Sequence, residues 1–233
     1  MAANGWICVS VDYRLSPAAT FPAHIIDCKQ AFSWVKDNIE AYGGNPDFVA
    51  ITGGSAGGHL SSLFALTPND PKFQPGFEDV DTTVQGCIPY YGIYDLSDTY
   101  ALHGNSGLYT LISKYVLKKP KETNREEYFA GSPMHRVHEN APPFFVLHGT
   151  SDTATSFTEA QRFVQELRKV SKNSVAFAEI PGAQHAFDIF PSVRSEYSKL
   201  AVERFANVLY SEYLVKQQEI TEQISKLGKI EKV

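Results

Sequence analysis

Features that would hold the chain together covalently or through a metal are scarce in this sequence. The 233 residues include three cysteines, Cys8, Cys28 and Cys87, which stand apart from one another with no CxxC pair. Disulfide frameworks and structural zinc sites require several suitably spaced cysteines, so neither a disulfide nor a metal site is expected. Each cysteine has apolar neighbours, and we predict that all three are reduced core residues.

Basic clusters and long apolar runs are missing as well. The formal net charge is -5, and no basic cluster is longer than the pair Lys118-Lys119. Nucleic acids and anionic membrane surfaces attract clustered positive charge, so neither is expected as a partner. No run approaches the roughly 18 consecutive apolar residues of a membrane-spanning helix, and no charged-then-apolar leader opens the chain. We therefore expect a cytoplasmic protein with no membrane span in this chain, while a longer parent could be membrane-associated.

What the sequence does contain is enough apolar material for one large core. Hydrophobic residues make up 43% of the chain, which at this length is typical of a single α/β domain. We predict that this domain covers residues 1–215, with an insertion at 96–140 whose poor periodicity is typical of a lid or a pocket wall. The remainder, 216–233, is charged and lacks aromatics, so it is expected to fray or extend into solvent.

Short apolar runs alternate with amphipathic segments along the chain, which is the pattern of a parallel sheet with crossover helices. A surface loop rich in proline, aspartate and glycine is expected at 67–81. Buried strands are predicted at 6–13, 48–52, 86–92, 142–148 and 175–180, and helices at 22–39, 108–117, 157–170 and 192–213, besides one that follows residue 55.

The turn Gly53-Gly54-Ser55-Ala56-Gly57 matches the GxSxG pattern of a nucleophile elbow, and it lies between an apolar strand and the start of a helix. Such a turn forces the serine into a sparsely populated backbone conformation, and a side chain on either flanking glycine would collide with the adjoining strand or helix. The free N–H groups at the helix start favour the negative charge that develops when Ser55 attacks a carbonyl. The alternative is a small-residue turn without chemistry, and the flanking strand and helix count against it.

Candidates for the acid and the base follow strands later in the chain, because catalytic groups of a parallel sheet collect at the carboxyl ends of its strands. Asp152 lies just beyond the fourth predicted strand and His185 beyond the fifth. The order Ser-Asp-His is that of α/β-hydrolases. Taken singly, Asp152 could be a turn or N-cap aspartate and His185 a surface histidine, but the two fit one constellation. Asp95 is the rival for the acid because it also follows a strand, and Asp188 is a weaker third.

Four ordered motifs make the chain resemble the hormone-sensitive-lipase-like carboxylesterases of the α/β-hydrolase superfamily. The resemblance extends from about residue 6 to about residue 213. The motifs are Asp12-Tyr13-Arg14-Leu15-Ser16-Pro17, Gly53-Gly54-Ser55-Ala56-Gly57-Gly58, His148-Gly149-Thr150-Ser151-Asp152 and Pro181-Gly182-Ala183-Gln184-His185-Ala186-Phe187.

This resemblance implies an α/β-hydrolase fold, with a mostly parallel sheet and helices on both faces. It also implies hydrolysis of carboxylic esters through a serine acyl-enzyme, without a cofactor or metal. The expected substrate is a small-molecule ester that has a short acyl chain or is small and lipophilic. Ser55, Asp152 and His185 fall on the family's catalytic triad, and Ala56 falls on the residue whose backbone N–H serves the oxyanion hole.

The chain departs from this family at its beginning. Members carry an HGGG-type loop between an earlier strand and the first helix, which supplies two more oxyanion N–H groups, and the residues before Trp6 cannot hold it. The first strands of the fold are lacking too, so we interpret the chain as a fragment or a truncated gene model. The alternative to an active esterase is therefore a catalytically impaired fragment, or a ligand-binding module on an esterase scaffold. Gibberellin receptors are such modules, but they have lost the catalytic histidine position that His185 retains.

Overall fold

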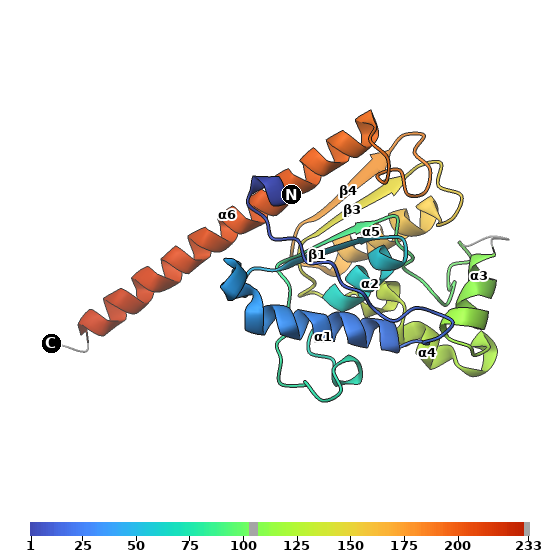
Figure 1. Cartoon of the computed structure of the whole chain (residues 1–233), viewed down its shortest axis with the longest axis horizontal. Helices are drawn as coiled ribbons and strands as arrows, with labels where there is room; N and C mark the ends of the chain where they lie inside the picture. Colours follow the sequence, from blue (N-terminus) through green and yellow to red (C-terminus); the bar gives the residue numbers. More distant parts are fainter. Residues whose placement is uncertain (103–106, 231–233) are drawn as a thin grey trace.

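Four parallel strands form the centre of the computed structural model, which describes residues 1–102 and 107–230 (Figure 1). They are β1 (Ala50–Gly54), β2 (Gly86–Tyr90), β3 (Phe144–Gly149) and β4 (Val175–Ile180). The sheet order follows the chain, β1-β2-β3-β4, and each neighbouring pair is parallel. Parallel neighbours require long crossover connections, as the alternation of apolar and amphipathic segments predicted.

The α-helices alternate with the strands in the predicted order, apart from α4, which was not predicted. They are α1 (Ala23–Asn38), α2 (Ala56–Ala65), α3 (Leu108–Leu111), α4 (Arg125–Ala130), α5 (Phe157–Val170) and α6 (Val193–Ile230), with a π-helical turn at Ile112–Val116 directly after α3. The start of α5 is capped by Ser156, whose hydroxyl oxygen accepts the backbone N–H of Glu159. The helices α1 and α5 lie at the amphipathic segments from which they were predicted, and α2 follows the turn at Ser55 from which it was predicted.

The core lies on both faces of the sheet, because successive side chains of a strand point to opposite sides. On one face, Phe144 and Val146 are fully buried against α1, α2 and α5. On the other face, Phe145 and Leu147 pack against Val202 of α6. The sheet therefore has helices on both faces, as predicted.

The predicted first strand is wrong. Residues 6–13 are outside any helix or strand, and the apolar side chains of Ile7, Val9 and Val11 remain between 38% and 46% exposed. In the described part of the chain β1 is an edge of the sheet, and residues 6–11 and β1 both line one groove of about 820 Å³. An apolar run indicates an extended segment, but a strand forms only where another backbone offers its N–H and C=O groups.

The prediction that all three cysteines are core residues is wrong for one of them. Cys8 lies in the unpaired segment at 6–13 and is exposed, whereas Cys28 is half-buried and Cys87 is buried. Desolvation raises the pKa of the Cys28 thiol to about 12. The two inner thiols therefore have the environment of packing residues and not of nucleophiles.

Residues 67–81 form a loop, as predicted, with a short 3-10 helix at Pro71–Phe73, but part of this loop lies in the core. Phe73 and Gln74 are buried in it. The buried ammonium of Lys29, on α1, donates to Gln74 Oε1 at 3.2 Å, to Thr82 Oγ1 at 3.1 Å and to the Thr67 carbonyl. Because a buried charge is tolerated only when hydrogen bonds replace its hydration, these acceptors fix the loop to α1. Composition alone indicated only a surface loop.

The insertion at 96–140 packs around a small core of its own, outside residues 103–106, which are not among the described residues. This core is formed by Leu96, Ile112, Leu117 and Tyr128. The predicted helix at 108–117 is present as α3 and the π-helical turn. A role of the insertion as a lid or pocket wall stays a prediction.

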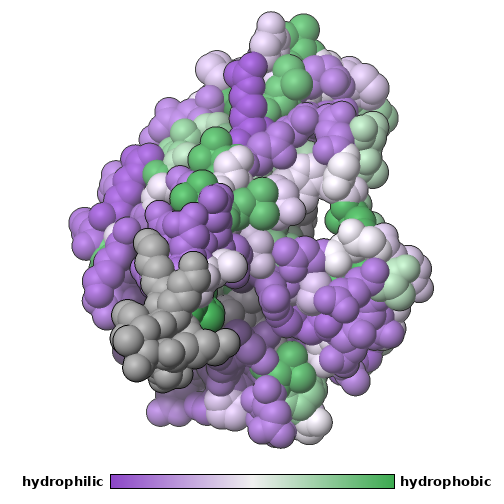
Figure 2. Space-filling model, turned by 90° about the vertical axis from the view of Figure 1, so that its left-hand side faces the viewer, coloured by the Kyte–Doolittle hydropathy of each residue, from purple (hydrophilic) through white to green (hydrophobic). Residues whose placement is uncertain are grey.

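The last helix is longer than predicted, whereas the charged tail extends into solvent, which is one of its two expected outcomes. The helix expected to stop at residue 213 continues through Ile230 and extends beyond the sheet (Figure 1). Side chains from 216 to 225 are all exposed, so this charged tail is helical and reaches into solvent instead of fraying there; 231–233 lie outside the described residues. The side of the molecule seen in Figure 2 is mostly hydrophilic, with hydrophobic residues in separate small groups. Within residues 1–102 and 107–230, no helix is both long and apolar enough to cross a membrane.

Candidate active site

Ser55 stands at the sharp turn between β1 and α2. Its backbone has φ 57° and ψ -115°, a conformation that residues other than glycine rarely adopt. The Ser55 N–H donates to the carbonyl of Tyr90, the last residue of β2, at 3.0 Å. The neighbouring strand thus holds the turn in place, with the serine at the carboxyl edge of the sheet.

Glycines around Ser55 allow backbone segments to approach one another closely. A Cβ on Gly53 would lie 2.6 Å from the backbone carbon and oxygen of Gly57. The collision expected at Gly57 itself is wrong, because a Cβ placed there meets nothing within 4 Å. Gly58 has that constraint instead, since its Cβ would lie 2.5 Å from the carbonyl oxygen of Tyr90. The space that glycine provides is needed where α2 passes β2.

Three side chains from separate loops meet at the carboxyl edge of the sheet. His185 Nε2 lies 2.9 Å from Ser55 Oγ, and His185 Nδ1 lies 2.8 Å from Asp152 Oδ2. Asp152 follows β3 and His185 follows β4, and parallel strands end at one edge. The Asp152 carboxylate is fully buried, whereas the His185 side chain is 24% exposed. An imidazole between a hydroxyl and a buried carboxylate can accept the hydroxyl proton while its new charge stays paired.

Hydrogen-bond donors surround the Asp152 carboxylate. Its Oδ1 accepts the backbone N–H of Ala154 at 2.8 Å and that of Thr155 at 2.9 Å, and the Thr155 hydroxyl lies 3.1 Å from Oδ2. Burial on its own raises the pKa of Asp152, but hydrogen bonds from His148, Thr155, His185 and Ala154 outweigh burial and leave this pKa well below its usual range. The carboxylate is therefore ionised at neutral pH.

His148 is a neighbour of Asp152 that sequence reasoning missed. Its side chain is fully buried, with Nε2 3.4 Å from Asp152 Oδ2 and 3.3 Å from the Thr155 carbonyl oxygen. The other ring nitrogen, Nδ1, has no hydrogen-bond partner within residues 1–102 and 107–230. The available signal was its place four residues before Asp152 at the end of a predicted strand, which puts both side chains at the same edge.

The two rival carboxylates have other partners. Asp95 is 2% exposed, accepts the Thr99 backbone N–H at 2.7 Å and lies 3.4 Å from His135 Nε2. Asp188 accepts the hydroxyl of Tyr91. Of the three candidate acids, Asp152 is the one that contacts the His185 ring.

Ala56 is the first residue of α2, so its N–H has no acceptor within the helix. It directly follows Ser55, at the end of the helix where the backbone dipoles favour negative charge. Among the described residues, no group of three or more His, Cys, Asp or Glu side chains is arranged to hold a metal ion.

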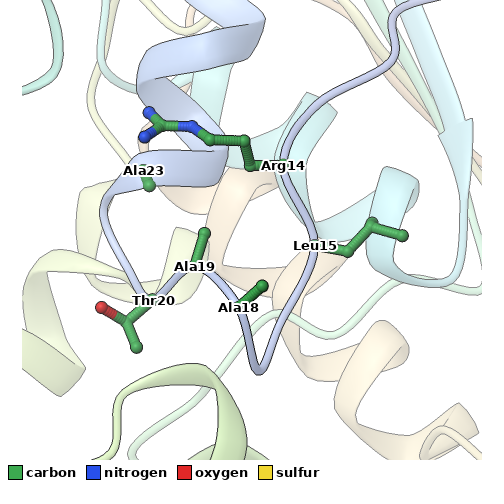
Figure 3. A pocket seen from close by; sticks show the side chains of 6 residues that line it. All are labelled: Arg14, Leu15, Ala18, Ala19, Thr20 and Ala23. Atoms are coloured by element: carbon green, nitrogen blue, oxygen red, sulfur yellow. The ribbon is translucent and has the colours of Figure 1, made fainter.

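A surface pocket of about 410 Å³ lies in the connection that precedes α1 (Figure 3). Ser55, Asp152 and His185 do not line it, and its charged member, Arg14, is paired with Asp27 at 2.7 Å. With small side chains and a charge that is already paired, this pocket has no groups for catalysis. Its lining consists of Arg14, Leu15, Ala18, Ala19, Thr20 and Ala23.

Known proteins are similar in sequence to this chain over most of its length. Residues 1–167 match the BD-FAE family. The chain belongs to the BD-FAE family. This BD-FAE chain is 51% identical over 212 residues to "Probable carboxylic ester hydrolase LipM" of Mycobacterium tuberculosis, and 46% identical over 210 residues to "Esterase LipQ" of the same organism. The matches cover 91% and 90% of this chain but 49% of each relative, so the chain spans about half the length of the curated relatives it matches.

Solved structures have the same fold as the BD-FAE chain. A truncated carbohydrate esterase from gut microbiota has a TM-score of 0.72 at 20% identity, with 87% of this chain and 73% of that chain covered. One of two fungal esterases from Rhizomucor miehei has a TM-score of 0.69 at 22% identity, with 87% and 64% covered. These similarities confirm the predicted α/β-hydrolase architecture.

Proposed function

We propose that this chain is part of a carboxylic ester hydrolase that acts through a serine acyl-enzyme. The observation that carries the proposal is the continuous hydrogen-bond chain from Ser55 through His185 to the buried Asp152. The relatives' names, carboxylic ester hydrolase and esterase, support the same reaction. Its substrate is a small-molecule ester that either has a short acyl chain or is small and lipophilic.

The reaction begins when His185 Nε2 takes the Ser55 proton and Oγ attacks the acyl carbon of the ester. The carbonyl electron pair moves to the oxygen, which the Ala56 N–H stabilises at the start of α2. When the tetrahedral intermediate collapses, the bond to the alcohol oxygen breaks and His185 returns the proton to that oxygen. Water then attacks the acyl-enzyme by the same route, which releases the acid and restores Ser55. Throughout, the Asp152 carboxylate accepts a hydrogen bond from the Nδ1–H of His185 and stabilises the imidazolium.

One oxyanion donor does not make a complete oxyanion hole. Loss of a single donor commonly lowers the rate about 10²–10³-fold, and the HGGG-type loop of the related esterases is not among these 233 residues. The 820 Å³ groove lined by 6–11 and β1 reaches Gly53 and Gly57, on either side of Ser55. A further strand seated in this groove, parallel to β1, would end beside Ser55, where a following loop could supply donors. Full activity thus belongs to a longer chain that fills the groove.

The insertion at 96–140 forms a wall of the substrate pocket in this proposal, within one catalytic domain at 1–215. It begins just beyond the carboxyl end of β2, so it rises from the edge of the sheet that carries Ser55. Its described residues pack around a small core, formed by Leu96, Ile112, Leu117 and Tyr128.

A second candidate is a catalytically impaired fragment or a ligand-binding chain on the esterase scaffold. The single oxyanion donor at Ala56 favours this candidate. The contact of His185 with both Ser55 and Asp152 weighs against it, because a binding site has no need of a base.

Labelling with a fluorophosphonate probe tests the proposal. We expect one adduct, located by mass on the peptide that contains Ser55, which disappears in Ser55→Ala and forms much more slowly in His185→Gln. Hydrolysis of p-nitrophenyl butyrate then separates the two candidates, because an impaired chain would be labelled without turning over substrate. Labelling that persists in Ser55→Ala would refute the assignment of Ser55 as the nucleophile.

A further inference from the structure

Tyr91, the residue after β2, contacts the site without belonging to the triad. It is 4% exposed, and its N–H donates to the carbonyl of Leu147 on β3 at 2.7 Å. Its φ of 34° is rare for a residue other than glycine. Because β3 holds this unusual backbone in place, the direction of the Tyr91 side chain is fixed.

The Tyr91 ring lies against the imidazole of His185. The ring centroids are 4.7 Å apart, and the planes meet at 60°. Such an edge-to-face contact restricts rotation of the imidazole. This restriction matters because one imidazole nitrogen faces Ser55 and the other faces Asp152.

The Tyr91 hydroxyl holds the loop that carries His185. It donates to Oδ1 of Asp188, three residues beyond His185. Between them Ala186 has φ 57°, so the loop turns sharply and Asp188 is tied back to the end of β2. Burial, then the Asp188 carboxylate, raises the pKa of Tyr91, so its hydroxyl stays protonated and donates at neutral pH.

The backbone of Tyr91 also reaches the acid side of the triad. Its carbonyl accepts the Thr155 hydroxyl at 3.1 Å. The same Thr155 oxygen lies 3.1 Å from Asp152 Oδ2 and 3.4 Å from His185 Nδ1. Tyr91 therefore contacts the His185 imidazole, Asp188 in the loop that carries His185, and Thr155, which lies beside the Asp152 carboxylate.

We infer that Tyr91 and Asp188 form a clamp that positions His185 for the proton transfer from Ser55. The ring sets the orientation of the imidazole, and the hydroxyl–carboxylate bond holds residues 185–188 at the end of β2. The inference rests on the proposed function, in which His185 is the base. A displacement of about 1 Å at a catalytic group can lower a rate about 10²-fold, so loss of the clamp slows the reaction without removing a substrate contact.

Substitutions of Tyr91 and Asp188, the two partners of the hydroxyl–carboxylate hydrogen bond, test the clamp. Tyr91→Phe keeps the ring and removes the donor, Asp188→Ala removes the acceptor, and Asp188→Asn keeps an oxygen that can accept from Tyr91. We expect the first two to lower both the rate of Ser55 labelling by fluorophosphonate and kcat for p-nitrophenyl butyrate about 10-fold to 100-fold, with KM unchanged. Asp188→Asn should stay near the wild-type rate. The double variant should be no slower than either single one, since both break the same bond.

Tyr94→Phe is the matched control, because it removes the hydroxyl of another fully buried tyrosine, which lies outside the insertion and whose ring stacks on Phe163 with centroids 4.2 Å apart. Proton NMR adds a readout that does not need turnover. The proton between His185 Nδ1 and Asp152 is expected to give a far-downfield signal, which Tyr91→Phe should move or broaden while Tyr94→Phe leaves it in place.

Wild-type labelling and an unmoved proton signal in Tyr91→Phe would overturn the clamp. So would Asp188→Asn if it were as slow as Asp188→Ala, because the bond itself would then not matter. Failure of the proposed function is a different result, namely labelling that persists in Ser55→Ala.

Discussion

Replacing Asp152 by asparagine puts an amide nitrogen where Oδ2 now faces His185, His148 and the Thr155 hydroxyl, and leaves the hydrogen bonds of Oδ1 in place. Asp152 Oδ1 accepts the backbone N–H groups of Ala154 and Thr155 at 2.8 and 2.9 Å, so the amide oxygen of Asp152→Asn takes that position. The amide nitrogen then replaces Oδ2, which lies 2.8 Å from His185 Nδ1. Two donors cannot bond, so the imidazole is driven to the tautomer with its proton on Nε2. That nitrogen faces Ser55 and can no longer accept its proton.

The expected magnitude follows from this change of tautomer. The same substitution in serine proteases lowers kcat about 10⁴-fold, which corresponds to about 5.4 kcal/mol of transition-state free energy. We expect a loss of this order for p-nitrophenyl butyrate hydrolysis and a parallel loss in the rate of Ser55 labelling. The melting temperature should change little, because the two backbone N–H groups keep their acceptor.

Asp95→Asn is the control, since Asp95 was the rival acid. Asp95 is buried and accepts the Thr99 N–H, so its replacement should lower the melting temperature while the folded fraction keeps its kcat. A larger loss of kcat at Asp95 than at Asp152 would refute the assignment of the acid. Unchanged kcat in Asp152→Asn would refute the reasoning from the tautomer.

Three further outcomes are expected. Burial lowers the pKa of His59 to about 4, below the value of about 6.5 in an unfolded chain, so the free energy of unfolding should fall by up to about 3 kcal/mol as pH drops from about 6.5 to about 4. Urea unfolding at several pH values checks this, and an equally steep dependence in His59→Gln would contradict it. Gly53→Ala should abolish Ser55 labelling and lower the melting temperature, because its Cβ meets backbone 2.6 Å away, whereas Gly57→Ala, with open space at its Cβ, should retain both. A longer chain with a strand in the groove beside β1 should melt at a higher temperature than residues 1–233, since burial of about 400 Å² of apolar surface contributes about 10 kcal/mol. Equal melting temperatures, with equal kcat/KM, would show that the groove needs no strand.

Local sequence patterns were sufficient to predict the strands of the sheet and most of the helices that flank it. The strands β1 to β4 and the helices α1, α2 and α5 lie close to their predicted ranges, because apolar periodicity depends on residues only a few positions apart. The same patterns failed at 6–13, where an apolar run lacks a partner, and at residue 213, where the helix was expected to end but α6 continues. In both places a local pattern was used to predict something that packing decides.

By itself, the sequence determined the strand–turn–helix around Ser55, the chain order of serine, aspartate and histidine, and the alternation of strands and helices, since each of these is written in neighbouring residues. Only the tertiary structure decided which carboxylate meets His185, that His148 and Tyr91 lie beside the triad, and that the first apolar segment stays unpaired. The physical reason is separation along the chain. Ser55 and His185 are 130 positions apart, and Tyr91 and Asp188 are 97 apart, so their contacts exist only because parallel strands end at one edge of the sheet.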